Sequence, residues 1–397
     1  MDQAFKHQIY PPVGTALSPN PPKLFQPLRI RDVTFHNRIW VSPMCTYSSP
    51  DGHLTDYHLI HLGGYALHGA SLTIIEVSAV HPDARTSPDD AGIWDDSHIR
   101  GIKRVVDFAH SRGQKIGIQI AHSGRKGSMT SLLRLPKGKT SMACDREDGG
   151  WPQRVKGPSP LRFGDEFVYP KEMSREDIAN VVGLFRDAAI RAVAAGVDII
   201  EIHGAHGYLL SSFLSRRSNC RTDEYGGSFE NRTRLPIEVV QKIRSVIPTG
   251  MPLFYRVSGT EWTDHPEAWR IEDTIEFAKL LATAGIDLLT ISSGGMDAKQ
   301  KIPKSLEYQV NLSREVRLAL RESKISLLCG AVGRITQAEQ AKNIIEDERT
   351  AKADIVLLGR QFMRDPAWVL RAAGELGVKV QWPAEYSLAM PGKESRL

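Results

Sequence analysis

Short apolar runs alternate along this chain with longer segments in which apolar residues recur at helical spacing. The runs are rich in valine, isoleucine and leucine, without the polar alternation of a half-exposed strand. Continuous runs of this kind are typical of strands covered on both faces, and the lengths between them suit crossover helices. The pattern predicts eight parallel strands, at residues 38–41, 71–77, 115–120, 197–202, 252–257, 286–291, 325–329 and 354–358.

Two helix-to-strand junctions nearly repeat each other, which supports a regular β/α succession. Residues 195–200 read Ala-Gly-Val-Asp-Ile-Ile, and residues 284–289 read Ala-Gly-Ile-Asp-Leu-Leu. Each glycine can take the left-handed conformation that ends a helix before a strand begins. Ser174 followed by Asp177 also predicts a capping box at the start of one helix. Eight such units predict an α/β protein built as a single (β/α)8 TIM barrel.

The segments outside these units set the predicted domain limits. Residues 1–26 contain five prolines and predict an extended N-terminal arm. Residues 27–376 form the predicted barrel domain, interrupted after its third strand by a long insertion at 127–170. Residues 377–397 form a C-terminal tail. The insertion fits a lid over the barrel mouth, and equally a solvated excursion without catalytic duty.

Composition narrows the class of partner. The formal net charge of +5 is spread over 51 basic and 46 acidic residues, so no basic run predicts binding to nucleic acid. We expect a small-molecule partner instead. The cysteines form no C-x-x-C pair, which argues against a zinc knuckle, an iron–sulfur cluster or a disulfide framework; they are Cys45, Cys144, Cys220 and Cys329.

Targeting signals are confined to the end of the chain. The first ten residues lack the apolar core of a signal peptide, and no later run could span a membrane, so we expect a cytoplasmic protein without a membrane partner. Ser395-Arg396-Leu397 resembles the peroxisomal address Ser-Lys-Leu, which makes a peroxisomal location the alternative. A fluorescent fusion with a free tail that stayed in the cytosol would reject the alternative.

The fourth apolar run leads directly into three hydrogen-bond donors, His203, His206 and Tyr208. Active sites of β/α barrels lie at the C-terminal ends of the strands. Hydrogen-bond donors held in place at the end of a buried strand suit a carbonyl substrate whose oxygen gains negative charge during reaction. The main alternative is a metal-dependent hydrolase, because barrels often carry zinc on histidines. However, Asp198 and Glu201 lie within the run rather than beyond it, so a third ligand is missing.

The last two strand ends are rich in glycine. Gly330 and Gly333 follow the seventh run, and Gly359 and Arg360 follow the eighth. The loops after strands seven and eight are the usual phosphate position in such barrels, where glycines let backbone N–H groups approach the anion. An arginine there would add a bidentate clamp. The pattern predicts a phosphate site.

Together these residues resemble the Old Yellow Enzyme family of FMN-dependent ene-reductases, especially its branch with a cysteine beside the flavin and paired histidines. The similarity covers roughly residues 23–372. Its most specific pieces are residues 42–47 (Ser-Pro-Met-Cys-Thr-Tyr), 119–126 (Gln-Ile-Ala-His-Ser-Gly-Arg-Lys), 203–208, 219–228 and 359–360.

The resemblance implies FMN as cofactor, NADPH or NADH as hydride donor, and reduction of the C=C bond of an α,β-unsaturated ketone or aldehyde. His203 and His206 would bind the carbonyl oxygen of this enone or enal, and Tyr208 would give the proton to Cα. Tyr47 would be a second phenol at the substrate, or simply a packing residue. A flavin-binding protein that has lost turnover is the remaining alternative.

The resemblance also implies the cofactor contacts. Gln119 would lie at the pyrimidine edge of the flavin, and Arg256 beside N1 and the C2 carbonyl, where a guanidinium stabilises the reduced state. The full predicted set is Ser42, Pro43, Met44, Cys45, Val77, Gln119, Arg256, Ser293, Gly330, Gly333, Gly359 and Arg360. No metal ligand is expected.

Two positions depart from the family pattern. Val77 stands where a small residue is expected, which is tolerable if only its backbone contacts the flavin. In the cysteine-bearing branch an arginine after a C-terminal tyrosine reaches the neighbouring subunit's site, whereas Tyr386 is followed here by Ser387-Leu388-Ala389. We expect a homodimer in which that contact is absent or supplied differently.

Overall fold

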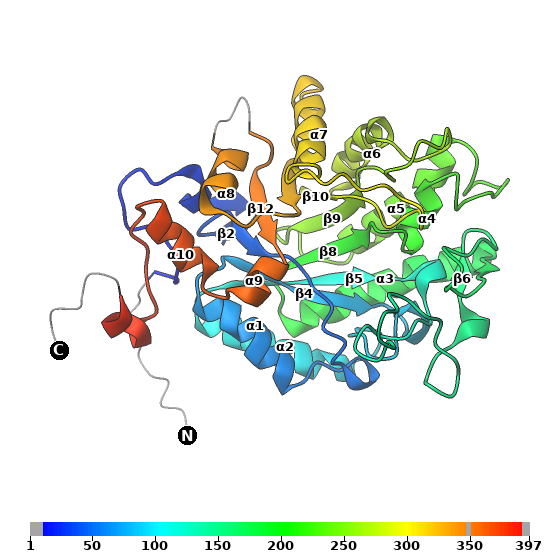
Figure 1. Ribbon diagram of the computed structural model, residues 1–397, viewed down its shortest axis with the longest axis horizontal. Helices are drawn as coiled ribbons and strands as arrows, with labels where there is room; N and C mark the ends of the chain where they lie inside the picture. Colours follow the sequence, from blue (N-terminus) through cyan, green and yellow to red (C-terminus); the bar gives the residue numbers. More distant parts are fainter. Residues whose placement is uncertain (1–10, 347–350, 391–397) are drawn as a thin grey trace.

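Eight parallel strands form a closed barrel at the centre of the computed structural model, which describes residues 11–346 and 351–390 (Figure 1). The strands follow one another around the ring in chain order, and the last pairs with the first. This confirms the predicted (β/α)8 fold. The strands are β3 (Ile39–Val41), β4 (Leu72–Ala79), β5 (Lys115–Ala121), β8 (Ile199–Gly204), β9 (Leu253–Ser258), β10 (Leu288–Ser292), β11 (Leu328–Val332) and β12 (Ile355–Leu358).

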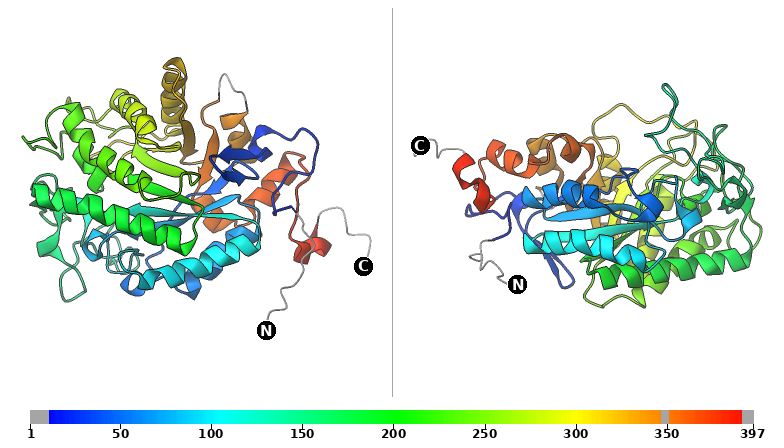
Figure 2. Two further views of the ribbon diagram at one scale, coloured as in Figure 1. Left: turned by 180° about the vertical axis from the view of Figure 1, so that it is seen from behind. Right: turned by 90° about the horizontal axis from the view of Figure 1, so that it is seen from below.

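Helices between the strands form the outer layer, and Figure 2 shows the long helices α2 and α3 lying along the outside of the barrel. The helices are α1 (Asp56–Leu67), α2 (Ser97–Ser111), α3 (Arg175–Ala195), α4 (Leu209–Leu214), α5 (Phe229–Arg244), α6 (Ile271–Ala284), α7 (Val310–Glu322), α8 (Ala338–Ile345), α9 (Arg360–Arg364) and α10 (Trp368–Glu375). The predicted capping box opens α3, because Ser174 and Asp177 exchange hydrogen bonds. Gly196 and Gly285 end α3 and α6 in the left-handed conformation (φ 86° and 102°), as predicted.

The strand limits differ from the prediction most clearly at the seventh strand. The prediction of 325–329 is wrong there, because β11 runs from Leu328 to Val332. Ile325 instead closes the end of α7, where its backbone N–H donates to the carbonyl of Leu320 (2.9 Å). An apolar residue that ends a helix and one that starts a strand have the same hydrophobicity, so the run alone could not separate them. Gly330 therefore lies inside β11, paired with Thr290 and Ile355, and not in the loop beyond it.

A separate apolar cluster closes the N-terminal end of the barrel. The antiparallel hairpin of β1 (Leu28–Ile30) and β2 (Val33–Phe35) contributes Phe35, which packs on Trp40 with ring centroids 4.6 Å apart. Trp40 in turn stacks on Phe254 across the barrel, with centroids 5.7 Å apart. This packing fills the bottom of the barrel and leaves the C-terminal strand ends for the site.

The described part of the N-terminal arm pairs with the tail. Backbone N–H groups of Gly14 and Leu17 donate to the carbonyls of Gln381 (2.9 Å) and Lys379 (2.8 Å). Ser395-Arg396-Leu397 lies outside the described residues. Among the helices that the structure describes, none is long and apolar enough to cross a membrane.

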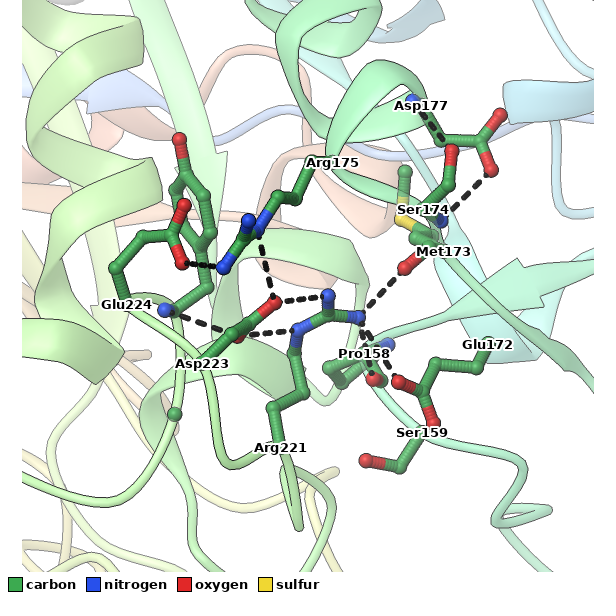
Figure 3. Close-up of polar contacts among 12 residues, drawn as sticks. Pro158, Ser159, Glu172, Met173, Ser174, Arg175, Asp177, Arg221, Asp223 and Glu224 are labelled. Atoms are coloured by element: carbon green, nitrogen blue, oxygen red, sulfur yellow. Dashed lines mark hydrogen bonds and ion pairs between the residues drawn. The ribbon is translucent and has the colours of Figure 1, made fainter.

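The insertion at 127–170 is tied down at its base by an arginine from the 219–228 motif (Figure 3). Arg221 donates to the carbonyls of Met173 (2.6 Å) and Pro158 (3.2 Å), and its guanidinium makes a bidentate pair with Asp223 (3.0 and 2.5 Å). Arg175 at the start of α3 pairs with Glu224 (2.7 Å). The motif therefore acts as a clasp between the insertion and the segment that joins α4 to α5.

Candidate active site

Two histidines and a tyrosine meet at the C-terminal end of β8, as the sequence predicted. The His203 ring lies 5.0 Å from the ring of His206 and 4.9 Å from that of Tyr208, measured between centroids, and both contacts are edge-on. His206 has a left-handed backbone (φ 59°), and its N–H donates to the Ser258 hydroxyl (2.9 Å). Strained non-glycine backbone of this kind is characteristic of functional sites.

Hydrogen bonds fix which ring nitrogen of each histidine is free. Nδ1 of His203 accepts from the N–H of Ala205 (3.2 Å), so Nε2 carries the proton in the neutral ring. Nε2 of His206 lies 2.7 Å from the hydroxyl of Ser292, which leaves its Nδ1 open. Burial, with neighbouring cationic groups, holds the pKa of His203 well below its usual value and lowers the pKa of His206 to about 3. Both imidazoles are therefore neutral at pH 7.

A cavity of about 180 Å³ holds both candidate phenols. Tyr47 and Tyr208 line it together with Lys126, Thr86 and residues of the insertion such as Leu132. Burial is the main cause that raises the pKa of each phenol. Both phenols therefore stay protonated at neutral pH. The same burial raises the pKa of the Cys45 thiol, which keeps it from acting as a thiolate nucleophile.

Lys126 joins two loops of the site. Its ammonium donates to the carbonyls of His206 (2.7 Å) and Gly295 (2.5 Å) and lies 3.7 Å from the centre of the Phe163 ring. Burial lowers the pKa of Lys126 to about 7. The sequence showed this lysine only as part of a family motif, and the structure shows that it joins the loops of His206 and Gly295 through their carbonyl groups.

The loop that carries Cys45 and Tyr47 is held from behind by a carboxylate that the sequence analysis missed. Glu76 accepts from the N–H (2.9 Å) and the hydroxyl (2.8 Å) of Thr46. The register between β4 and β5 shifts between Ile75 and Ser78, which places a β-bulge at Glu76 and Val77. Bulges re-aim side chains next to active sites. The bulge lies beside Gln119, so Val77 and Gln119 are neighbours at the barrel mouth.

The predicted pyrimidine contacts share one buried carboxylate. Gln119 donates its amide Nε2–H to Glu201 (2.6 Å), and Nε of Arg256 forms an ion pair with the same oxygen (3.3 Å). Arg256 also donates from Nη1 to the hydroxyl of Ser42 (3.1 Å). Its buried Nη2 has no hydrogen-bond partner among the described residues. An unpaired buried donor costs about 1–3 kcal/mol, so this atom fits a ligand oxygen or nitrogen.

The predicted phosphate residues border a separate cavity of about 350 Å³ between β11 and β12. Gly333, Gly359 and Arg360 line it, and Gly330 does not, because it lies within the strand. Arg334 and Arg364 also line it and were missed by the sequence analysis. Gly333-Arg334 repeats the dipeptide Gly359-Arg360, which is the signal that could have revealed Arg334. The cationic lining suits a phosphate.

Two further predicted residues, Ser293 and Met44, connect neighbouring strand ends. Ser293 donates to Gln309 (2.7 Å), whose amide donates to the carbonyl of Val332, so this serine links the β10 and β11 loops. A side chain at Gly359 would lie 3.3 Å from the sulfur of Met44, which places the β3 and β12 ends in contact. Residues 11–346 and 351–390 contain no group of three His, Cys, Asp or Glu side chains that could hold a metal ion.

Comparison with known proteins identifies the family. A model of the NADH:flavin oxidoreductase / NADH oxidase family matches residues 23–378. The chain belongs to this family. NADH:flavin oxidoreductase FG08077 of Gibberella zeae is 41% identical over 394 residues, covering 96% of this chain and 92% of that protein.

Two solved structures are similar to this NADH:flavin oxidoreductase. Morphinone reductase in complex with tetrahydroNAD has a TM-score of 0.71 at 25% identity, and the match covers 91% of this chain and 93% of that one. A complex of 2-naphthoyl-CoA reductase has a TM-score of 0.75 at 23% identity; it covers 89% of this chain but 52% of that one, so it shows the shared fold. The protein is therefore an FMN-dependent oxidoreductase related to Old Yellow Enzyme, with a nicotinamide as hydride donor.

Proposed function

We propose that this oxidoreductase reduces the C=C bond of an α,β-unsaturated ketone or aldehyde. The observation that carries the proposal is the contact of two neutral imidazoles with each other and with a protonated phenol, Tyr208, that itself lines a cavity. Bound FMN supplies a hydride from N5 to the β-carbon of the substrate. What remains for the chain is to hold the carbonyl oxygen and to deliver a proton to Cα.

The two histidines suit the carbonyl oxygen because each can give a hydrogen bond without carrying charge. His203 offers Nε2–H, since its Nδ1 accepts from Ala205. His206 offers Nδ1–H when the Ser292 hydroxyl donates to its Nε2. Charge builds on the substrate oxygen as the enolate forms, and each well-placed donor then lowers the barrier by about 3–4 kcal/mol.

Tyr208 is the proposed proton donor. It immediately precedes α4, its ring packs on that of His203, and its side chain lines the cavity. Because burial raises the pKa of this phenol, it is protonated throughout the neutral range and can act as the acid. Tyr47, which lines the same cavity, is the proposed second substrate contact.

The side chains of the barrel mouth fit FMN at both ends. Arg256 offers its unpaired Nη2–H at one end, and Gly333 and Arg360 border the cationic cavity at the other. Ser42, Pro43, Met44, Cys45, Val77, Gln119, Ser293 and Gly359 are the further proposed contacts of the cofactor. Gly330 would act only by packing, because a side chain there would meet Ile355 and Leu357.

Replacement of Tyr208 by phenylalanine tests the proposal. We expect Tyr208→Phe to leave flavin reduction by NADPH nearly unchanged and to slow re-oxidation by an enone about 100-fold or more, because only the second half-reaction needs the proton. Stopped-flow absorbance of the flavin resolves the two phases. Tyr169→Phe, at an exposed phenol of the insertion, is the matched control and should change neither phase. Equal slowing of both phases in Tyr208→Phe would contradict the assignment.

We also propose a homodimer, on the resemblance to the Old Yellow Enzyme family. Tyr57 and Ile60, three residues apart on α1, are 47% and 76% exposed, and an apolar pair on one helix face suits a dimer interface. Sedimentation velocity measures the oligomeric state directly, and a monomer at micromolar concentration would reject the dimer.

A further inference from the structure

We infer that Glu201 is a positioning residue that fixes the hydrogen-bonding pattern offered to the pyrimidine edge of FMN, and thereby the reduction potential of the bound flavin. The inference rests on the proposed placement of FMN above Gln119 and Arg256. It concerns a residue that would not touch the flavin itself.

Glu201 lies inside the barrel, on β8, and is completely buried. Its neighbours come from three other strands. One carboxylate oxygen accepts from Gln119 of β5 (2.6 Å) and faces Nε of Arg256 of β9 (3.3 Å), and the other accepts from the hydroxyl of Thr290 of β10 (2.9 Å). A buried carboxylate with one ion pair and two hydrogen bonds is fixed in position.

The charge of Glu201 decides which way the Gln119 amide points. An ionised carboxylate only accepts hydrogen bonds, so Gln119 must turn its NH₂ group toward Glu201, as the 2.6 Å contact shows. The carbonyl oxygen of Gln119 is then the atom that points away from Glu201. That oxygen is an acceptor, and the pyrimidine edge of an isoalloxazine presents one N–H donor, at N3.

The same carboxylate orients Arg256. Nε of Arg256 faces Glu201 as an ion pair and Nη1 donates to Ser42, whereas the buried Nη2 lacks a hydrogen-bond partner among the described residues and is the nitrogen left to face a ligand. The Nη2–H donor of Arg256 and the oxygen acceptor of Gln119 complement the C2=O acceptor and the adjacent N3–H donor of the isoalloxazine. Glu201 thus sets both halves of the pattern, and its negative charge partly offsets the positive charge that Arg256 places near N1.

Two measurements on Glu201→Gln test the inference. A glutamine at this position can offer its own NH₂ group, so Gln119 is free to reverse, and one negative charge is lost. We expect FMN to bind about tenfold more weakly, the loss of one hydrogen bond of ordinary strength. We expect the midpoint potential of the bound flavin to become more positive, because the uncompensated Arg256 favours anionic reduced flavin. Fluorescence titration of the apoprotein and a spectroelectrochemical titration give the two values.

Thr290→Val is the matched control, because it removes a hydrogen bond from the same carboxylate and leaves its charge in place. If Glu201 serves only the packing of the barrel, both variants will lose thermal stability and neither will change the potential. An unchanged potential in Glu201→Gln would overturn the inference, whereas a wild-type protein that bound no FMN would overturn the proposed function as well.

A flavin analogue tests the orientation of Gln119 in the wild-type protein, even if Glu201→Gln does not fold. N3-methyl-FMN cannot donate to the Gln119 oxygen, so the wild-type apoprotein should bind it about tenfold more weakly than FMN. Where Glu201→Gln does fold, that discrimination should shrink, because the reversed amide no longer presents its oxygen. Equal wild-type affinity for FMN and the analogue would contradict the orientation assigned to Gln119.

Discussion

At the scale of single residues, protonation of Glu76 makes the stability of the folded chain depend on pH. Its carboxylate is 2% exposed and lies 3.6 Å from Nε2 of His58, besides its two contacts with Thr46. Burial, with a smaller contribution from the charge of Asp90, raises the pKa of Glu76 from 4.5 to about 7, against the opposing effect of the hydrogen bonds from Thr46. The proton on Glu76 is therefore held more tightly in the folded chain than in the unfolded one.

The direction of the resulting pH dependence follows from proton counting. Between about pH 4.5 and pH 7 the folded state binds more protons at Glu76, so the free energy of unfolding falls as the pH rises through this window. The slope from one such group is at most about 1.4 kcal/mol per pH unit. We expect Glu76→Gln to remove this contribution, so that the variant gains stability relative to wild type as the pH rises. Urea unfolding at half-unit pH steps measures the difference.

The difference between the two proteins is the quantity to compare, because buried histidines titrate in the same range. Burial lowers the pKa of His58 to about 4, for example, and a lowered histidine pKa gives the opposite slope. His58→Gln supplies a control of opposite sign. A wild-type minus Glu76→Gln difference that stayed constant from pH 4.5 to pH 7 would contradict the assignment.

At the scale of elements, the Arg221 clasp holds the base of the insertion. Removing the guanidinium leaves Asp223 with its ion pair to Arg175 and the hydrogen bond from the N–H of Tyr225, and it frees the carbonyls of Pro158 and Met173. Breaking one partner of a fully buried pair costs about 3–5 kcal/mol, and the cost is smaller here because the Asp223 side chain is 19% exposed. We therefore expect Arg221→Gln to open the insertion locally, with trypsin cutting within residues 127–170 about tenfold faster or more.

Peptide mapping after limited proteolysis locates these cuts. Asp165→Asn lies in the insertion, weakens only an exposed ion pair with Arg162 and keeps every lysine and arginine at which trypsin cuts, so its cleavage rate should stay close to that of wild type. Cuts spread evenly over the chain in Arg221→Gln would mean that the clasp stabilises the whole fold instead of the insertion.

Elements were predictable from the sequence where a local pattern determines them. The apolar runs gave the eight strands, and Ser174 with Asp177 gave the start of α3, because both depend on neighbouring residues. The strand at 328–332 was misplaced, since an apolar residue can serve a helix end as well as a strand. The grouping of His203, His206 and Tyr208 was predictable because they share one strand end.

Glu76 and Glu201 were not predictable as parts of the site, because a lone acid within an apolar run reveals neither its orientation nor its partners. The partners of Glu201 lie 82 and 89 residues away in sequence, at Gln119 and Thr290, and only closure of the barrel brings them together. The bulge that turns Glu76 toward Thr46 has no glycine or proline to mark it. Long-range polar pairing is thus the part of the site that the sequence alone could not supply.

For the whole molecule, the site and the packed end lie at opposite ends of one barrel. Aromatic side chains fill the N-terminal end, whereas the proposed cofactor contacts come from the C-terminal ends of strands all round the ring. A ligand that bridges β5, β9 and β12 joins distant parts of the ring. FMN should therefore stabilise the whole fold by mass action, by about 2.7 kcal/mol when free FMN is 100 times its dissociation constant.

Two variants separate the contributions of the two ends. Arg360→Gln should weaken phosphate binding, so that a fixed FMN concentration gives a smaller increase in the free energy of unfolding. Phe254→Leu should lower the stability of the apoprotein by about 1–3 kcal/mol through lost packing on Trp40, and leave the FMN-dependent increase unchanged. Urea unfolding with and without FMN measures both quantities. Were Phe254→Leu to abolish the increase while Arg360→Gln retained it, the cofactor would have to bind at the other end of the barrel.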